Sequence, residues 1–204
     1  MDTYQINGLL KRHMTTRDKF VGTFAFDEIP HIISSDTRFV IVNQDPSTMN
    51  GSHWVALEVT RGIPNTSHSG TYFDSYGQQP PAFMDKAVVQ TIGPQYIFNK
   101  KPLQAQFSTT CGQWCMAFIH QRCLGTCLQD FLDKFDSKDL WENDEKVNRY
   151  VERTFRTDLD VVDENFLRSQ IGTTCRQSCR PRCLNMACKT ACTPVQCAVL
   201  KKCS

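Results

Sequence analysis

The sequence predicts an α+β domain, because short strand-like segments alternate with helical ones in a chain long enough to bury a sizeable core. Its 204 residues and 40% hydrophobic content fit one globular domain, with or without a tail. No apolar run approaches the length of a membrane span, and the first residues lack the basic start and apolar block of a signal peptide. We therefore expect no secretion signal and no membrane partner.

Two apolar periodicities mark the expected elements. The strand signals share β-branched or aromatic residues in short runs, and they fall at residues 20–26, 38–43, 53–59, 71–77 and 95–99. The helix signals share apolar residues three or four apart, and they fall at residues 2–14, 81–90, 111–127 and within 128–170. In the first helix we expect Tyr4, Ile6, Leu9 and Leu10 on one face. In the last region, Asn143 and Asp144 are expected to cap a helix that closes over the sheet.

His53 is the histidine best placed to act as a fixed general base. It opens the predicted strand 53–59, directly after a Gly-Ser pair that lets the backbone turn. The next predicted strand ends in Asp74 and a turn. If the two strands are antiparallel neighbours, Asp74 lies beside His53, and its carboxylate can fix the imidazole tautomer.

A thiol lies at the start of the strongest helical pattern. Ser108, Thr109 and Thr110 are favoured N-cap residues, and apolar residues recur at helical spacing from Cys111 to Cys127. Cys111 in the first turn faces unpaired N–H groups and the positive end of the helix dipole, which favour a thiolate and can stabilise an oxyanion. The pattern fits a nucleophile served by a histidine base, and it also fits a buried structural cysteine.

Two further assignments stay open from spacing alone. Gln104 and Gln106 lie seven and five residues before Cys111, and either amide could act as a second oxyanion donor. A zinc site is the alternative to a cysteine stripe in the core, with the ligands Cys115, His120, Cys123 and Cys127. His120 does not share a face with the three cysteines, which favours packed thiols over a metal site.

The composition changes sharply after Gly172, so we expect a domain over 1–170 and a tail over 171–204. The last 32 residues hold seven of the eleven Cys and six basic residues but no acid, a formal charge of +6. The first 172 residues hold 17 basic and 21 acidic residues, a formal charge of −4. This asymmetry fits a basic arm that contacts the phosphates of double-stranded DNA, and it fits equally a disordered tail with reduced thiols.

Four short motifs occur in a characteristic order. They are Phe20-Val21-Gly22-Thr23-Phe24, Ile41-Val42-Asn43 followed ten residues later by His53-Trp54, Tyr72-Phe73-Asp74-Ser75-Tyr76-Gly77, and Gln104 through Cys111-Gly112. Together they resemble the adenovirus endopeptidase (adenain) family, part of a clan with the SUMO- and ubiquitin-like-protein proteases. The seven-residue step from Gln104 to Cys111 also resembles that family and favours Gln104 over Gln106. The resemblance covers roughly residues 5–165 and does not reach the tail.

The resemblance implies an adenain-like or papain-like architecture, with a small central mixed sheet flanked by helices and the nucleophile at the N-terminus of a core helix. It implies a thiol protease, a cysteine endopeptidase in which Cys111 is the nucleophile, His53 the base, Asp74 the group that orients His53, and Gln104 an oxyanion donor. No cofactor or metal is required for this chemistry. The implied substrates are viral capsid and core precursors, cut after small residues such as Gly during virion maturation.

The resemblance also implies a monomer that acts in the virion and the host cell nucleus, with viral DNA and a viral peptide as activators. In that family the peptide forms a disulfide with a cysteine upstream of the nucleophile. No cysteine precedes Cys111 here, so activation through that linkage is not expected. Two other functions stay open: a protease for ubiquitin-like or SUMO-like proteins, and an inactive protease fold that serves as a basic DNA-packaging protein.

Overall fold

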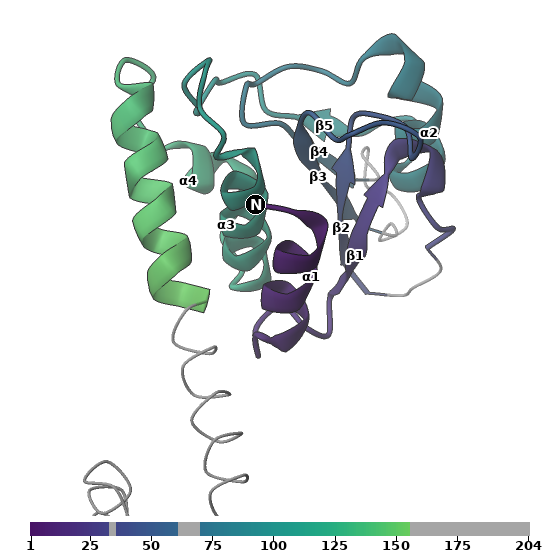
Figure 1. The fold of residues 1–204 in the computed structure, drawn as a ribbon, viewed down its shortest axis with the longest axis horizontal. Helices are drawn as coiled ribbons and strands as arrows, with labels where there is room; N and C mark the ends of the chain where they lie inside the picture. Colours follow the sequence, from purple (N-terminus) through teal and green to yellow (C-terminus); the bar gives the residue numbers. More distant parts are fainter. Residues whose placement is uncertain (33–35, 61–69, 156–204) are drawn as a thin grey trace, which may run out of the picture. The chain divides into compact units, whose positions relative to one another are not determined.

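The structure is a computed structural model that describes residues 1–32, 36–60 and 70–155 (Figure 1). These residues form a five-stranded mixed sheet with helices packed on both faces, which confirms the predicted α+β class. The predicted tail over 171–204 and its boundary with the domain lie outside the described residues. No helix in the described ranges is long and apolar enough to cross a lipid bilayer.

The strands of the sheet lie in chain order. They are β1 (Phe20–Ala25), β2 (Arg38–Asn43), β3 (Trp54–Val59), β4 (Gly70–Phe73) and β5 (Ile97–Phe98). The central pairs β2–β3 and β3–β4 are antiparallel, and the outer pairs β1–β2 and β4–β5 are parallel. Each strand overlaps a predicted one, and the antiparallel neighbours expected around residues 53–59 and 71–77 are present.

Helices cover both faces of this sheet (Figure 1). They are α1 (Thr3–Arg12), the 3-10 turn η1 (Phe26–Glu28), α2 (Ala82–Ile92), α3 (Cys111–Cys123), α4 (Leu128–Leu132) and a helix over 140–155. The helices α1, α3 and 140–155 pack on one face, and α2 packs on the other. Strand β2 serves both layers, because Phe39 and Ile41 face α3 whereas Val40 and Val42 face α2.

Helix α3 is the centre of the larger core. Residues 111, 112 and 114–120 are buried, and a helix that is buried on nearly every side belongs to the interior of a domain. Phe118 stacks on Phe73 of β4 with ring centroids 4.4 Å apart. Near the end of α3, the Arg122 guanidinium donates two hydrogen bonds, of 2.7 and 2.9 Å, to the Glu58 carboxylate of β3. The stacked rings and this bidentate ion pair therefore fix α3 against the sheet at two points.

The expected helix over 111–127 is shorter than predicted. It ends at Cys123, and Gly125 follows with a φ of +90°, a backbone conformation that suits glycine and ends a helix. Cys127 is therefore not on α3. It is the exposed N-cap of α4, where its sulfur accepts a hydrogen bond from the Asp130 N–H at 3.3 Å.

Two assignments of individual side chains are also wrong. Tyr4 is 82% exposed, because the buried face of α1 is set by Ile6 and Leu10, four residues apart. The helix expected to begin at Asn143 and Asp144 begins at residue 140, so both side chains lie inside it and are buried. Asp139 lies just before this helix, and its side chain accepts a hydrogen bond from the Glu142 N–H at 2.9 Å, as an N-cap does.

Candidate active site

The sheet brings His53 and Asp74 to one end. Strands β3 and β4 are antiparallel, and their ladder ends with Ala56 opposite Phe73. His53 comes directly before β3 and Asp74 directly after β4, so both lie just beyond that last pair. Helix α3 begins at the same end with Cys111, whose thiol hydrogen-bonds the His53 ring. Three residues that the sequence singled out are therefore in contact.

His53 is held in place through Asp74. The imidazole Nε2 lies 2.8 Å from Asp74 Oδ1, which leaves Nδ1 to face Cys111. The same carboxylate oxygen accepts a hydrogen bond from the Tyr76 N–H at 2.9 Å. The backbone of Asp74 is fixed by the Asn99 amide, which accepts from its N–H at 2.9 Å and donates to its carbonyl at 2.6 Å. Backbone and side chain of Asp74 are thus both constrained, and the imidazole orientation follows from them.

The ionisation of the thiol and the imidazole follows from these contacts. Burial alone would lower the pKa of His53, but its hydrogen bonds to Asp74 and Cys111 outweigh burial and raise this pKa to about 9. Burial alone would raise the pKa of Cys111, but hydrogen bonds from His53 and from the Trp54 and Gly112 backbone N–H groups lower it. Both shifts favour a thiolate beside an imidazolium over a neutral thiol beside a neutral imidazole, and a thiolate is the reactive form of a cysteine.

Tyr76 covers one face of the His53 imidazole. Its ring stacks on His53 with centroids 4.7 Å apart and an interplanar angle of 27°. Burial, and then the nearby charges of Cys111 and Asp74, raise the pKa of the Tyr76 hydroxyl. The phenol therefore stays neutral, and the ring shields one side of His53 from water.

Gln104 is buried beside this group, and a short network fixes its amide. Ser75 donates a hydrogen bond to Gln104 Oε1 at 2.6 Å, which turns Nε2 toward the loop before α3. Nε2 donates to the Ser108 carbonyl at 2.8 Å and lies 3.4 Å from the Tyr76 hydroxyl. The second contact is long for a hydrogen bond, so one amide N–H keeps most of its donor capacity. Gln106, the alternative candidate, is exposed.

A buried carboxylate ties this loop to α3. Asp144, in the helix over 140–155, accepts hydrogen bonds from the Ala105 N–H at 3.1 Å, the Thr110 hydroxyl at 2.6 Å and the Trp114 indole at 2.7 Å. Thr110 is the N-cap of α3, but its hydroxyl donates to Asp144 and accepts no hydrogen bond from a helical N–H. The first turn of α3 therefore has no side-chain cap, and its N–H groups lie beside Cys111.

Cys115 and Cys123 differ from Cys111 in their ionisation. Burial raises the pKa of Cys115 well above its ordinary range, and its thiol donates to the Trp54 carbonyl at 3.4 Å. Burial also raises the pKa of Cys123, to about 11. Among the described residues no three His, Cys, Asp or Glu side chains lie close enough to hold a metal ion, and Cys127 lies off α3, so the four residues of the zinc alternative are not brought together.

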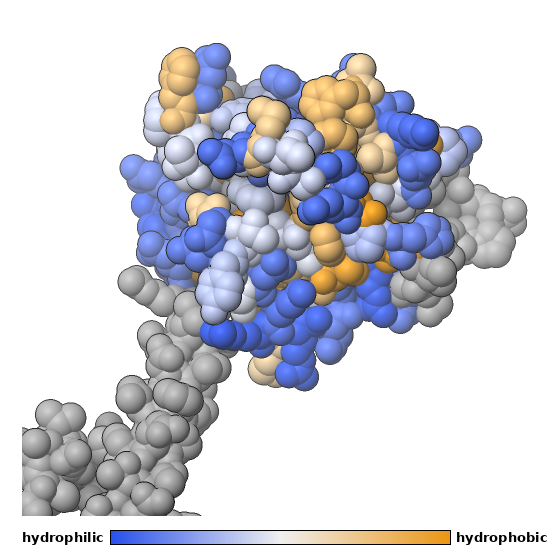
Figure 2. All heavy atoms as spheres, turned by 45° about the vertical axis from the view of Figure 1, so that its right-hand side comes forward, coloured by the Kyte–Doolittle hydropathy of each residue, from blue (hydrophilic) through white to orange (hydrophobic). Residues whose placement is uncertain are grey.

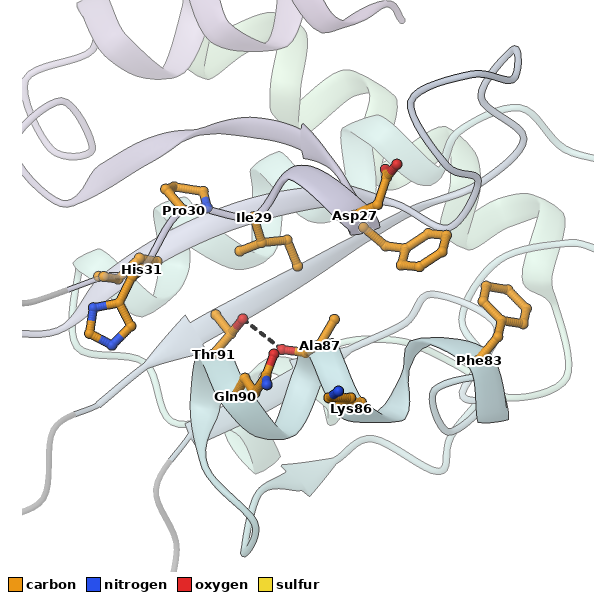
Figure 3. Close-up of a pocket in the computed structure, with 11 residues that line it drawn as sticks. Asp27, Ile29, Pro30, His31, Phe83, Lys86, Ala87, Gln90 and Thr91 are labelled. Carbon is orange, nitrogen blue, oxygen red and sulfur yellow. Dashed lines mark hydrogen bonds between the residues drawn. The ribbon is translucent and has the colours of Figure 1, made fainter.

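A groove on the surface lies away from these residues. A groove of about 700 Å³ runs between η1 with its following segment and α2, where Ile29, Pro30 and Phe83 line it together with Asp27 and Lys86 (Figure 3). None of the predicted site residues lines this groove. On the face drawn in Figure 2, hydrophobic surface occurs as patches between hydrophilic side chains.

The comparisons with known proteins rest on the fold. No protein-family model matches this sequence, and no curated protein matches it. A crystal structure of the ASFV pS273R protease matches with a TM-score of 0.51 and 18% identity, over 76% of this chain and 66% of that one. This chain shares its fold. A selenomethionine crystal structure of the same protease matches with a TM-score of 0.39 and 25% identity, over 59% of this chain and 43% of that one. This chain thus spans just under two thirds of the length of the first of these viral proteases.

Sequence reasoning missed the residues that support the site. Ser75 lies inside a motif that the sequence singled out, but its bond to Gln104 depends on a loop 29 residues away. Asn99 and Asp144 act across 25 and 34 residues, on Asp74 and Thr110. A polar residue within an apolar helical pattern, as at Asp144, is the one signal that could have pointed to a buried contact.

The pKa shifts predict how the thiol responds to pH. Alkylation of Cys111 by iodoacetamide, followed by mass spectrometry at each cysteine, should increase with pH. The midpoint of this increase should lie below the ordinary pKa range of a thiol. Asp74→Asn removes the carboxylate that favours the His53 cation, so the pKa of His53 should fall and alkylation of Cys111 should shift to higher pH. Cys123, with a pKa of about 11, serves as an internal control. Identical pH profiles for Cys111 and Cys123 would contradict the ion pair.

The contacts of Asp144 predict a loss of stability when its charge is removed. Asp144→Asn places an amide NH₂ against donors that need an acceptor, so the free energy of unfolding should fall by about 3 kcal/mol. Asp139→Asn is the matched control, because Asn caps a helix as well as Asp does and the change should stay within about 0.5 kcal/mol. Urea unfolding followed by circular dichroism measures both. Equal effects of the two substitutions would rule out the described role of Asp144.

Proposed function

We propose that this chain is a cysteine endopeptidase with Cys111 as its nucleophile. The observation that carries the proposal is the hydrogen-bonded row of Cys111, His53 and Asp74 at the start of a buried helix. A fold shared with a viral protease supports it, as does the depressed pKa of the Cys111 thiol, which its contact with His53 produces.

The proposed reaction begins with the ion pair. The Cys111 thiolate attacks the carbonyl carbon of the scissile peptide bond, and the negative charge moves to the carbonyl oxygen. The Cys111 backbone N–H and one N–H of the Gln104 amide stabilise this oxyanion. The protonated His53 then gives its proton to the leaving amine, so the C–N bond breaks and an acyl-enzyme remains on the sulfur.

The second half restores the enzyme. His53, now neutral, takes a proton from a water molecule that attacks the thioester carbon. The tetrahedral intermediate collapses, the acid product leaves, and Cys111 returns as thiolate beside the imidazolium. Asp74 keeps Nε2 occupied throughout, so that Nδ1 remains directed at the reacting atoms.

The proposed biological role is maturation of virus particles. The substrates would be capsid and core precursor proteins cut after small residues such as Gly, in the virion and the host cell nucleus, by an adenain-like enzyme that works as a monomer. Support comes from the ordered sequence motifs and from the fold shared with a viral protease. No cofactor enters the chemistry, and a viral peptide activator would have to act without a cysteine upstream of Cys111.

The basic tail is proposed to hold the enzyme on double-stranded DNA. Its six basic residues and absence of acids support contacts to phosphate, whereas residues 1–172 are net negative. Confinement on packaged DNA would raise the local concentration of enzyme and precursor. DNA would then act as an activator without any role in bond cleavage.

Substitution of the three contacting residues tests the proposed activity. With a fluorogenic Gly-containing capsid-precursor peptide, Cys111→Ala and His53→Ala should each lower kcat by at least about 10³-fold, because they act as a unit. Asp74→Asn should cost less, on the order of 10- to 100-fold, since the helix start still favours the thiolate.

Cys123→Ala is the matched control for loss of a thiol and should retain full activity. Full turnover by Cys111→Ala would refute the nucleophile. Cleavage of SUMO or ubiquitin conjugates with no cleavage of precursor peptides would instead support the ubiquitin-like-protein protease.

Truncation after Gly172 tests the role of the tail. The full chain should bind duplex DNA with a log–log salt slope of about −5, as expected for six neutralised phosphates. The truncated chain should lose most of this affinity and keep its activity on a small peptide. DNA binding that is unchanged by the truncation would show that the tail is not the DNA-binding segment.

A further inference from the structure

The hydroxyl of Tyr76 lies beside the amide that the proposed reaction uses as an oxyanion donor. Its oxygen is 3.4 Å from Gln104 Nε2, and the hydroxyl donates to the Gln106 carbonyl across another 3.4 Å. Both distances are long for hydrogen bonds, so neither contact holds the hydroxyl firmly. The side chain is half-buried, and its ring covers His53 while its hydroxyl reaches the exposed Gln106. The phenol O–H is therefore a weakly engaged donor between His53 and the loop before Cys111.

We propose that the Tyr76 hydroxyl is a third oxyanion donor, which binds the oxygen of the scissile carbonyl in the transition state together with Gln104. The inference rests on the proposed endopeptidase function and adds a catalytic residue to it. The phenol donates a hydrogen bond and keeps its own proton. The movement of electrons and protons in the proposed reaction is therefore unchanged.

Two donors that lie 3.4 Å apart can serve a single oxygen, because an oxygen about 2.9 Å from both forms a normal hydrogen bond with each. Gln104 is oriented for this. Its Oε1 accepts from Ser75 and one N–H donates to the Ser108 carbonyl, which leaves the other N–H directed at Tyr76. An arriving oxyanion gives this N–H and the phenol O–H a shorter, charged partner in place of a long, neutral one. Hydrogen bonds to a charged oxygen are the stronger kind, so the exchange favours the transition state.

The backbone of Tyr76 is fixed before any substrate arrives. Its N–H donates to Asp74 Oδ1 at 2.9 Å, and the Gly77 N–H donates to the Asp74 carbonyl at 2.8 Å. Gly77 has a φ of +70°, and a Cβ there would lie 2.7 Å from the Lys101 carbonyl carbon. The turn that carries Tyr76 therefore packs closely against the segment that leads to Gln104.

The segment that carries Gln104 is tied to the same turn. The Ser75 carbonyl accepts the N–H groups of Leu103 and Gln104, at 2.8 and 3.1 Å. The Ser75 hydroxyl also holds the Gln104 amide, at 2.6 Å. The Tyr76 and Gln104 donors thus lie on two backbone segments that are bonded to each other, as a preorganised oxyanion site requires.

The phenol keeps its proton where the thiolate is formed. Burial, and then the charges of Cys111 and Asp74, raise the pKa of the Tyr76 hydroxyl. Hydrogen bonds, with His53 first among the partners, lower the pKa of Cys111. The two shifts widen the pH range in which Cys111 is a thiolate while Tyr76 still has an O–H to donate.

Tyr76→Phe tests the hydroxyl, because it keeps the ring that stacks on His53. With the Gly-containing precursor peptide, kcat should fall at least about tenfold at an unchanged KM, since the lost hydrogen bond forms only in the transition state. Tyr96→Phe is the matched control. It also removes a phenol hydroxyl with a raised pKa and one hydrogen bond, of 3.2 Å to Asp85, on the face of the sheet that α2 covers. This variant should keep full kcat, and a Tyr76→Phe variant with full kcat would refute the inference.

Alkylation separates an effect on the oxyanion from an effect on the ion pair. Iodoacetamide consumes the Cys111 thiolate at a saturated carbon, so no oxyanion forms. Tyr76→Phe should therefore keep the wild-type pH profile of Cys111 alkylation and the wild-type free energy of unfolding in urea. A shifted profile would show that the hydroxyl acts through His53 and Cys111, contrary to the inference.

A peptidyl trifluoromethyl ketone with Gly at the cleavage position tests the donor without turnover. The Cys111 sulfur bonds to the ketone carbon, the C=O bond becomes a single bond, and the oxygen takes over the negative charge of the thiolate. Fluorine NMR follows this adduct through a pH titration. The pH at which the adduct oxygen takes up a proton should be about one unit higher in Tyr76→Phe, a tenfold change in its protonation equilibrium, and unchanged in Tyr96→Phe.

The adduct also separates this inference from the proposed activity. A chain that cuts no peptide but shows the shift would overturn the endopeptidase proposal and support Tyr76 as an oxyanion donor. A chain that cuts peptides but whose adduct titrates equally in the wild type and Tyr76→Phe would do the reverse. A chain whose Cys111 forms no adduct would contradict both.

Discussion

The packing of α3 against β3 and β4 is the constraint on which the candidate site depends. Cys111 meets His53 only because the helix starts where the two strands end, and this position is fixed further along the helix. Phe118 stacks on Phe73, and Arg122 grips Glu58 with two hydrogen bonds. A shift of α3 along the sheet would disturb both contacts together with the contact between the thiol and the imidazole. One helix thus packs against the sheet and, through that packing, positions Cys111 at its N-terminus.

Around α3 and the sheet, buried polar groups fix backbone segments that apolar packing leaves free. Asn99 fixes the backbone of Asp74, and Asp144 fixes the loop before α3. Hydrogen bonds are directional, so they set orientations that apolar contacts leave free. Thr110 illustrates the cost, because its hydroxyl serves Asp144 and no longer caps α3. The helix start is left without a side-chain cap, so its N–H groups can stabilise a thiolate or an oxyanion.

Local patterns in the sequence carried much of the fold. Short runs of strand-forming residues predicted the strands. The glycine and turn residues around His53 and Asp74 predicted that both lie at strand ends. Contacts between distant segments were out of reach, because no local signal links Asp144 to Thr110 or Ser75 to Gln104. The helix expected to reach Cys127 fails for a related reason: its cysteines kept helical spacing, but Gly125 takes a positive φ and ends it. The buried position of Asp144 replaced an expected N-cap because burial in the assembled core outweighs local capping preference.

The contacts of Asp144 also bear on when during synthesis the site becomes complete. The segment from Ala105 to Trp114 donates three hydrogen bonds to a carboxylate that the ribosome adds 30 to 39 residues later. A growing chain therefore contains His53 and Cys111 before it contains the group that fixes the loop preceding Cys111. Since domains fold as units, Cys111 acquires its final surroundings only together with the helix over 140–155. The candidate site is therefore among the last parts of the domain to be completed.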